Sequence, residues 1–128
     1  MITGIGLDLC EVSRMQKLLQ DDRFLNRFFT PEETAYIRSK GASSAQTMAG
    51  IFSAKEALGK ALGTGISFEL KDAEILHDEH GCPYYCLHGD LPERVPGESF
   101  HLSITHDGGV SAAVCIREKA PDSVLLPE

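Results

Sequence analysis

Three charged side chains occupy positions where the surrounding pattern favours apolar or small residues. On a helical wheel of residues 44–62, Lys55 falls in the middle of the apolar arc and Glu56 lies at its edge. Asp8 ends a short alternating segment on a face that otherwise carries mainly glycine. Burying a lysine or a carboxylate is costly unless the charge is paired. Each of the three side chains therefore needs a partner from another part of the chain.

One explanation is a divalent cation. If the fold brings Asp8 and Glu56 together, their carboxylates repel each other unless a cation lies between them. Paired carboxylates with few other protein ligands suit Mg²⁺, which is commonly shared with substrate phosphates. Lys55 and Lys60 would then meet those phosphates. Gly4 and the other glycine on the face of Asp8 favour this explanation, because they leave room for a ligand to approach the backbone.

The alternative explanation is a set of internal salt bridges without a metal. Asp8 would then pair with Lys55. Glu56 would pair with Arg14 or Lys60. Structural ion pairs also occupy buried positions of this kind, so the spacing of the residues alone leaves both explanations open.

Five potential zinc ligands lie within twelve residues, namely His77, His80, Cys82, Cys86 and His88. Their spacing matches none of the usual pairs of zinc ligands. A glycine and a proline inside the segment already explain it as a hairpin turn. The two cysteines and the last histidine would share one face of a strand, which keeps a metal site possible, but we do not predict one here.

The elements that position these residues predict one α+β domain at residues 1–119, with an antiparallel sheet against a long central helix and a flexible tail at 120–128. Thr30 followed by proline and two glutamates is a typical helix start, and the Gly-Thr-Gly at 63–65 ends the longest helical pattern. The expected helices cover residues 12–20, 30–40 and 44–62, with a short helical or irregular stretch at 23–29. The expected strands cover 2–9, 70–77, 84–88, 99–106 and 110–117.

Charge and composition exclude some classes of function. With 19 acidic and 12 basic residues among 128, the chain carries a net charge of −7, which argues against a general nucleic-acid binder. No apolar run is long enough for a membrane span, and we expect no leader, so a cytoplasmic location with four reduced cysteines is predicted. The first half still holds a basic cluster that could meet an acidic partner or form a solvated helix face, namely Arg14, Lys17, Arg23, Arg27, Arg38 and Lys40.

Three stretches stand in a specific order along the chain. They are residues 4–9 followed by Glu11 and Arg14, residues 52–61 followed by the glycines at 63–65, and residues 102–106. In order and spacing they resemble the holo-[acyl-carrier-protein] synthases, the small bacterial class of 4′-phosphopantetheinyl transferases. The resemblance extends over about residues 2–117.

The resemblance implies a reaction and a set of residues. Phosphopantetheine would pass from coenzyme A to a serine of apo acyl carrier protein, releasing adenosine 3′,5′-bisphosphate, in a homotrimer with active sites between subunits. Asp8 and Glu56 would hold Mg²⁺ and, with Lys60, form the catalytic group. The coenzyme-binding residues would be Lys55, Lys60, Gly63, Gly65, Thr105 and His106, and the carrier-binding residues would be Arg14, Leu18, Arg23, Phe24 and Arg27. Core packing is an equally good explanation for the phenylalanine.

The sequence also departs from this family. Many relatives carry an arginine, associated with the coenzyme's 3′-phosphate, at the position of Ile51, and a longer charged turn after His106. Two further functions therefore stay open. One is a Mg²⁺-dependent nucleotide phosphohydrolase that uses the same carboxylates, and the other is a non-catalytic trimeric binding module of the same fold.

Overall fold

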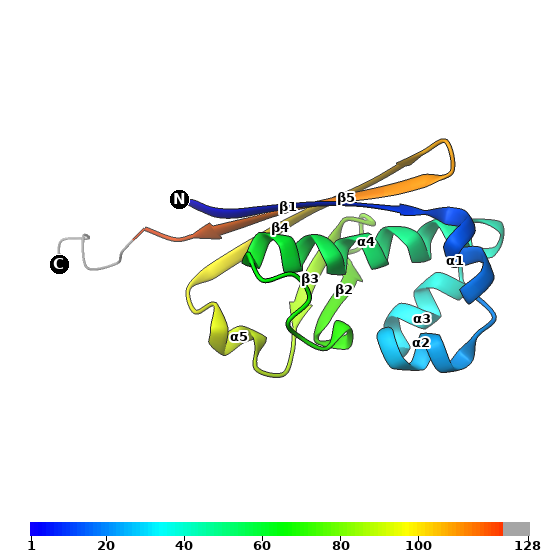
Figure 1. The fold of residues 1–128 in the computed structure, drawn as a ribbon, viewed down its shortest axis with the longest axis horizontal. Coiled ribbons are helices and arrows are strands. Elements are labelled where there is room, and N and C mark those ends of the chain that lie inside the picture. Colours follow the sequence, from blue (N-terminus) through cyan, green and yellow to red (C-terminus); the bar gives the residue numbers. More distant parts are fainter. Residues whose placement is uncertain (122–128) are drawn as a thin grey trace.

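A long helix, α4, lies along one face of a three-stranded antiparallel sheet, and the shorter helices and a two-stranded sheet lie on the other side of that helix (Figure 1). The computed structural model describes residues 1–121. In chain order the elements are β1 (Ile2–Glu11), α1 (Val12–Leu18), α2 (Asp22–Phe28), α3 (Pro31–Arg38), α4 (Ser44–Leu62), β2 (Ala73–His77), β3 (Pro83–Leu87), α5 (Leu91–Arg94), β4 (Glu98–Asp107) and β5 (Val110–Lys119). This architecture confirms the predicted α+β fold.

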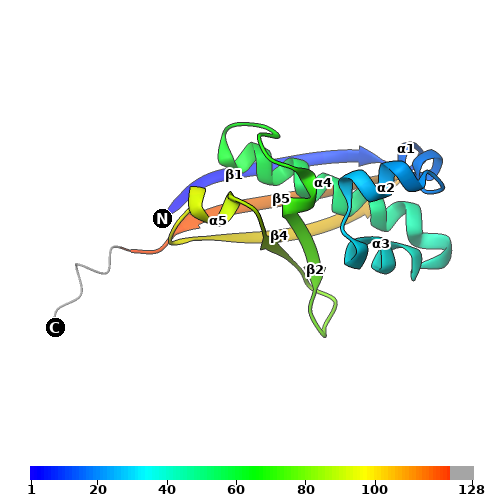
Figure 2. The ribbon, with the colours of Figure 1, turned by 90° about the horizontal axis from the view of Figure 1, so that it is seen from below.

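The element boundaries differ from the prediction in a few places. The strand expected from residue 70 begins at Ala73, after a 3₁₀ turn at Leu70–Asp72, and the short helix α5 was not predicted. The strands form two sheets, with order β1-β5-β4 in one and the β2-β3 hairpin alone in the other (Figure 2). The predicted tail falls mostly beyond the described residues. Within residues 1–121, no helix combines the length and the apolar character that a membrane crossing requires.

Helix α3 begins and helix α4 ends where the sequence predicts. At the start of α3, the Thr30 hydroxyl accepts a hydrogen bond from the Glu33 amide at 3.1 Å, and the Glu33 carboxylate accepts one from the Thr30 amide at 2.9 Å. This reciprocal pair is the capping box that the Thr-Pro-Glu-Glu sequence indicates. At the end of α4, Gly63 adopts a left-handed conformation with φ of +80° and stops the helix.

Two glycines of β1 allow the strand to approach α4 directly. A Cβ atom on Gly6 would overlap the carbonyl oxygen of Ala57, and one on Gly4 would overlap that of Ala61. The glycines therefore make room for the helix backbone. The interpretation that they make room for a ligand is wrong, because the helix fills that space.

A Gly6→Ala variant tests this contact. The added methyl group meets helix backbone, which cannot rotate away, so we expect the free energy of unfolding to fall by about 3 kcal/mol. Urea denaturation gives this value. Thr3→Ala, on the opposite face of the same strand, is the matched control and should cost about 1 kcal/mol or less. Equal small losses in both variants would show that β1 and α4 are not in backbone contact.

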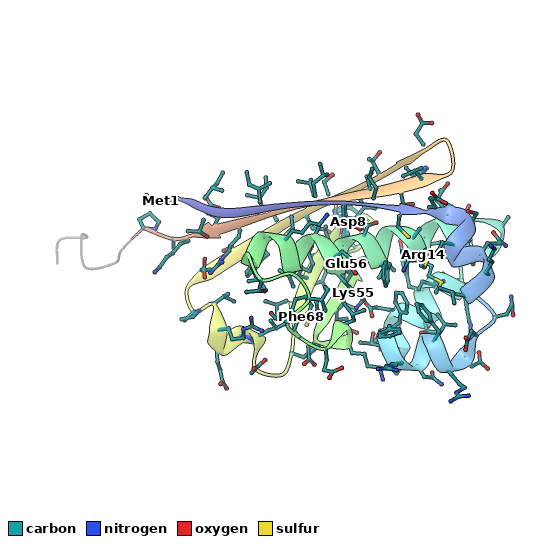
Figure 3. All side chains as sticks on the ribbon, in the orientation of Figure 1. Met1, Asp8, Arg14, Lys55, Glu56 and Phe68 are labelled. Carbon is teal, nitrogen blue, oxygen red and sulfur yellow. The ribbon has the colours of Figure 1, made fainter. Side chains whose placement is uncertain are left out.

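The face of the sheet that points away from α4 is uncovered in the single chain and is apolar on β1 and β5. On β1, Ile5, Leu7 and Leu9 remain 62%, 60% and 67% exposed. Their cross-strand neighbours on β5 continue the apolar surface with Ala112 and Val114. Figure 3 shows side chains of the sheet standing clear on the side opposite to α4. An apolar surface of this kind is typical of a protein–protein contact.

Candidate active site

The structure brings Asp8 and Glu56 together at the contact between β1 and α4 (Figure 3). Lys60 joins them there as the partner of Asp8. The Lys60 ammonium donates to Asp8 Oδ1 at 3.2 Å and to the Leu7 carbonyl at 2.9 Å. Glu56 precedes Lys60 by one helical turn, so both side chains leave α4 on the same side. The close approach of β1 at Gly6 is what places Asp8 beside this helix face.

In this group the two carboxylates repel each other, and the nearby positive charges only partly offset that repulsion. Burial and, after it, the negative charge of Asp8 raise the pKa of Glu56, while Lys60 and Arg14 oppose the rise. Among residues 1–121, Glu56 has no hydrogen-bond or ion-pair partner. The alternative set of internal salt bridges is therefore wrong in its pairs, because Asp8 pairs with Lys60 instead of Lys55, and Glu56 pairs with neither Arg14 nor Lys60 among residues 1–121.

The donor set fits a divalent cation that prefers oxygen ligands. Both carboxylates come from rigid elements, and the Asp8 side chain is only 17% exposed, so its charge is not dispersed by bulk water. Carboxylate oxygens with open neighbouring positions are suited to Mg²⁺, which keeps several waters or substrate oxygens in its coordination shell.

Lys55 does not belong to this group. Its side chain is completely buried, and its ammonium forms an ion pair with Glu33 at 2.9 Å. The same ammonium donates to the carbonyl oxygens of Leu70 and Ala73, at 2.7 and 2.8 Å. All its donors are thus used inside the protein, and the prediction that Lys55 meets the substrate's phosphates is wrong. The expectation that Lys55 needs a partner from a distant segment is confirmed, although the partner is Glu33 rather than Asp8.

Gly63 and Gly65 lie just beyond Lys60, in an exposed loop that folds back onto the last turn of α4. The amides of Thr64 and Gly65 both donate to the Gly59 carbonyl, at 3.3 and 3.0 Å. A side chain at Gly59 would collide with Gly65, so this glycine is what lets the loop close. The loop therefore presents the two glycines beside Lys60.

Thr105 and His106 do not join the Asp8 group within one chain. Thr105 lies on the uncovered face of β4, opposite to the face of the sheet on which Asp8 lies. His106 lies on the covered side but lines a pocket with Gly50 and Ile51. Gly50 and Ile51 lie on the side of α4 that faces away from Glu56. Helix α4 thus separates the pocket from the carboxylates.

The predicted carrier-binding residues gather on α1 and α2. Arg14 is exposed, with its guanidinium 5.3 Å from the centre of the Phe52 ring, and it is close enough to lower the pKa of Glu56. Arg23 and Arg27 are also exposed. Leu18 and Phe24 are half-buried against the core, and the Phe24 ring lies 4.9 Å from that of Phe28. Phe24 therefore packs in the core and keeps only part of its surface for a partner.

The pKa of Glu56 gives a direct test of this geometry. Without divalent cations, Asp8→Asn should lower the pKa of Glu56 by removing a repelling charge, and Lys60→Gln should raise it by removing an attracting one. Since the folded-state pKa lies above the unfolded value of 4.5, ionised Glu56 destabilises the fold at neutral pH, and this cost disappears as the pH falls toward 4.5.

A carboxyl NMR titration measures both shifts, and Glu79→Gln on an exposed turn is the control that should leave the value unchanged. An unchanged pKa of Glu56 in Asp8→Asn would show that the two acids do not interact.

Known proteins share both this sequence and this fold. The family model of the 4′-phosphopantetheinyl transferase superfamily matches residues 4–115. A holo-[acyl-carrier-protein] synthase of Treponema denticola is 46% identical over 122 residues, covering 92% of this chain and 99% of that protein.

Two solved structures extend the likeness. The holo-[acyl-carrier-protein] synthase of Neisseria meningitidis has a TM-score of 0.83 at 31% identity and covers 93% of this chain and 100% of its own. That of Helicobacter pylori, solved in complex with coenzyme A, has a TM-score of 0.79 at 30% identity and covers 89% and 99%. The chain therefore belongs to the 4′-phosphopantetheinyl transferase superfamily and is an enzyme of its holo-[acyl-carrier-protein] synthase class.

Proposed function

We propose that this enzyme transfers 4′-phosphopantetheine from coenzyme A to a serine of apo acyl carrier protein in a Mg²⁺-dependent reaction that releases adenosine 3′,5′-bisphosphate. The observation that carries the proposal is that the two carboxylates of Asp8 and Glu56 lie close enough to repel each other, with Lys60 beside them. The solved relatives from Helicobacter pylori and Bacillus anthracis are described as complexes with coenzyme A, which supports the choice of co-substrate.

Each residue of the group has a part in this reaction. Asp8 and Glu56 would hold Mg²⁺, which when bound neutralises charge on the coenzyme's pyrophosphate. Lys60, with a 52% exposed side chain, adds a second positive charge for the phosphates. The exposed loop with Gly63 and Gly65 offers its backbone beside this lysine.

The rest of the site is proposed to come from a second copy. Thr105 faces the uncovered apolar side of the sheet, and His106 lies across α4 from the carboxylates of its own chain. Packing of copies through this sheet face would bury Ile5, Leu7 and Leu9. We therefore propose a homotrimer whose active sites lie between subunits, with Thr105 and His106 contributed by the neighbour. We further propose a cytoplasmic location, which the four free thiols favour.

The deciding experiment is mass spectrometry of a carrier protein. Incubation of an apo acyl carrier protein with the enzyme, coenzyme A and Mg²⁺ should add one phosphopantetheine to the carrier, and chelation of Mg²⁺ should prevent it. Phosphate release without a carrier would identify a phosphohydrolase instead. Binding of coenzyme A without transfer to several carriers would identify a binding module.

Arg14 is expected to act on the carrier rather than on the coenzyme. It is exposed on α1, and an enzyme with a net charge of −7 needs local positive charge to attract an acidic partner. Arg14→Glu should raise the KM for the carrier by about tenfold or more and leave the KM for coenzyme A nearly unchanged. Steady-state assays with each substrate varied give both constants, and equal effects on the two would remove Arg14 from the docking surface.

A further inference from the structure

The β2-β3 hairpin collects three side chains that commonly bind metals, away from the site described above. Glu74 lies directly opposite Cys86 in the register of the two strands, and His88 follows two residues later. One ligand atom from each of the three residues lies within 4.8 Å of the other two. The charged groups that act on Glu56 are Asp8, Lys60 and Arg14, and the three hairpin residues are not among them, so this group is not part of the proposed catalytic group.

The carboxylate of this group is held in place and ionised. The Glu74 side chain is only 9% exposed, and the Thr30 hydroxyl donates to its Oε2 at 2.6 Å. Its Oε1 lies 2.8 Å from His88 Nε2. Burial acts to raise the pKa of Glu74, but the hydrogen bonds with Thr30 and His88 outweigh it and leave the pKa lowered. Oε1 is therefore a fixed anionic oxygen that faces the ring nitrogen of the histidine.

The backbone structure of the hairpin fixes the positions of His88 and Cys86. The His88 amide donates to the Asp72 carbonyl at 2.8 Å, which fixes the chain where it leaves β3. Cys86 is a half-buried free thiol on the same strand. The His88 side chain is 48% exposed, so solvent reaches the group from one side.

We propose that Glu74, Cys86 and His88 form a Zn²⁺ site with a fourth position open to solvent. A thiolate, an imidazole and a carboxylate form a ligand set that Zn²⁺ accepts, whereas Mg²⁺ and Ca²⁺ prefer oxygen alone. The two anionic ligands balance the charge of the ion. Ligand atoms around tetrahedral zinc lie about 3.3–3.8 Å apart. The three ligand atoms already lie within 4.8 Å of one another, so side-chain rotations, including one that moves Glu74 Oε1 and His88 Nε2 apart from 2.8 Å, complete the site.

A metal ion at this site would stabilise the contact between the β2-β3 hairpin and the start of α3. Thr30 caps α3 and also orients Glu74, so an ion bound by Glu74 links β2, β3 and the start of α3. Outer contacts of this kind orient metal ligands and raise affinity. The sequence pattern placed Cys86 and His88 on one strand face but did not indicate Glu74 as their partner, because Glu74 lies outside the histidine and cysteine cluster. Of that cluster, His77 instead stacks on Tyr36 with ring centres 3.8 Å apart.

Metal titration of the whole enzyme tests the proposal. Metal-free protein in excess Mg²⁺ should bind one Zn²⁺ per chain in competition with a chromophoric chelator, and Co²⁺ should give a thiolate charge-transfer band. Cys86→Ser should abolish that band, and His88→Gln should weaken Zn²⁺ binding at least about tenfold. Thr30→Val should weaken it by about tenfold through its outer contact.

The controls are Cys82→Ser, which removes an exposed thiol at the other end of the hairpin, and Asp8→Asn, which alters the proposed Mg²⁺ site. Both should bind Zn²⁺ as the parent enzyme does, and Zn²⁺ should raise the Tm of the parent but not of Cys86→Ser. No saturable binding, no thiolate band, or loss of binding in either control instead of Cys86→Ser would overturn the proposal.

Discussion

Glu56→Gln is expected to lower the rate of phosphopantetheine transfer by more than about 100-fold while the protein stays folded. Glutamine keeps the size of the side chain but removes an anionic oxygen that would hold Mg²⁺. Because burial and Asp8 raise the pKa of Glu56, its negative charge opposes folding at neutral pH. Loss of the charge should therefore leave the Tm unchanged or raise it. Asp8→Asn should lower turnover to a similar extent.

The combination of rate and stability separates a catalytic from a structural role. Turnover is measured by carrier mass at saturating coenzyme A and Mg²⁺, and Tm by calorimetry on the same samples. Glu79→Gln, the same change on an exposed turn, should leave both unchanged. A variant of Glu56 or Asp8 with normal turnover and a much lower Tm would favour a structural salt bridge and contradict the proposed metal site.

Lys55→Ala is expected to destabilise the fold by about 3–5 kcal/mol. The change leaves the carboxylate of Glu33 buried without a counter-ion and removes the donor from the carbonyl oxygens of Leu70 and Ala73. Glu33 also accepts hydrogen bonds from the amides of Thr30 and Ile75, so the disturbance reaches both the start of α3 and strand β2.

Urea denaturation of matched variants tests this prediction. Lys60→Ala removes the other lysine of the helix, whose side chain is 52% exposed, and should cost less than about 1 kcal/mol. The double variant Lys55→Met/Glu33→Gln removes both charges and should recover part of the loss. A stable Lys55→Ala protein without activity would instead place Lys55 in the reaction.

The sequence alone identified the residues that needed explanation but not always their partners. The wheel of α4 correctly marked Lys55 and Glu56 as charges on a nearly apolar helix. The partner of Lys55 could not be found, because the capping box already accounts for Glu33 and a second role for the same side chain has no local signal. Only the packing of α3 on α4 brings these two residues together.

Strand order was also beyond the reach of local patterns. Alternation correctly predicts that Thr105 and His106 lie on opposite faces of their strand. It does not reveal that β5 separates β4 from β1, or that the helix covers the glycine face of β1. Glycines at positions 4 and 6 would be expected on β1 whether a ligand or a helix packs against that face. In this structure the helix packs there.

The backbone contact at Gly6 has a consequence for how this enzyme tolerates mutation. No side chain stands between strand and helix at Gly6 and Ala57, which are close neighbours of Asp8 and Glu56. Side-chain repacking elsewhere in the interior should therefore change the distance between Asp8 and Glu56 very little. Accumulated core substitutions should erode the melting temperature well before they alter the affinity for a divalent ion.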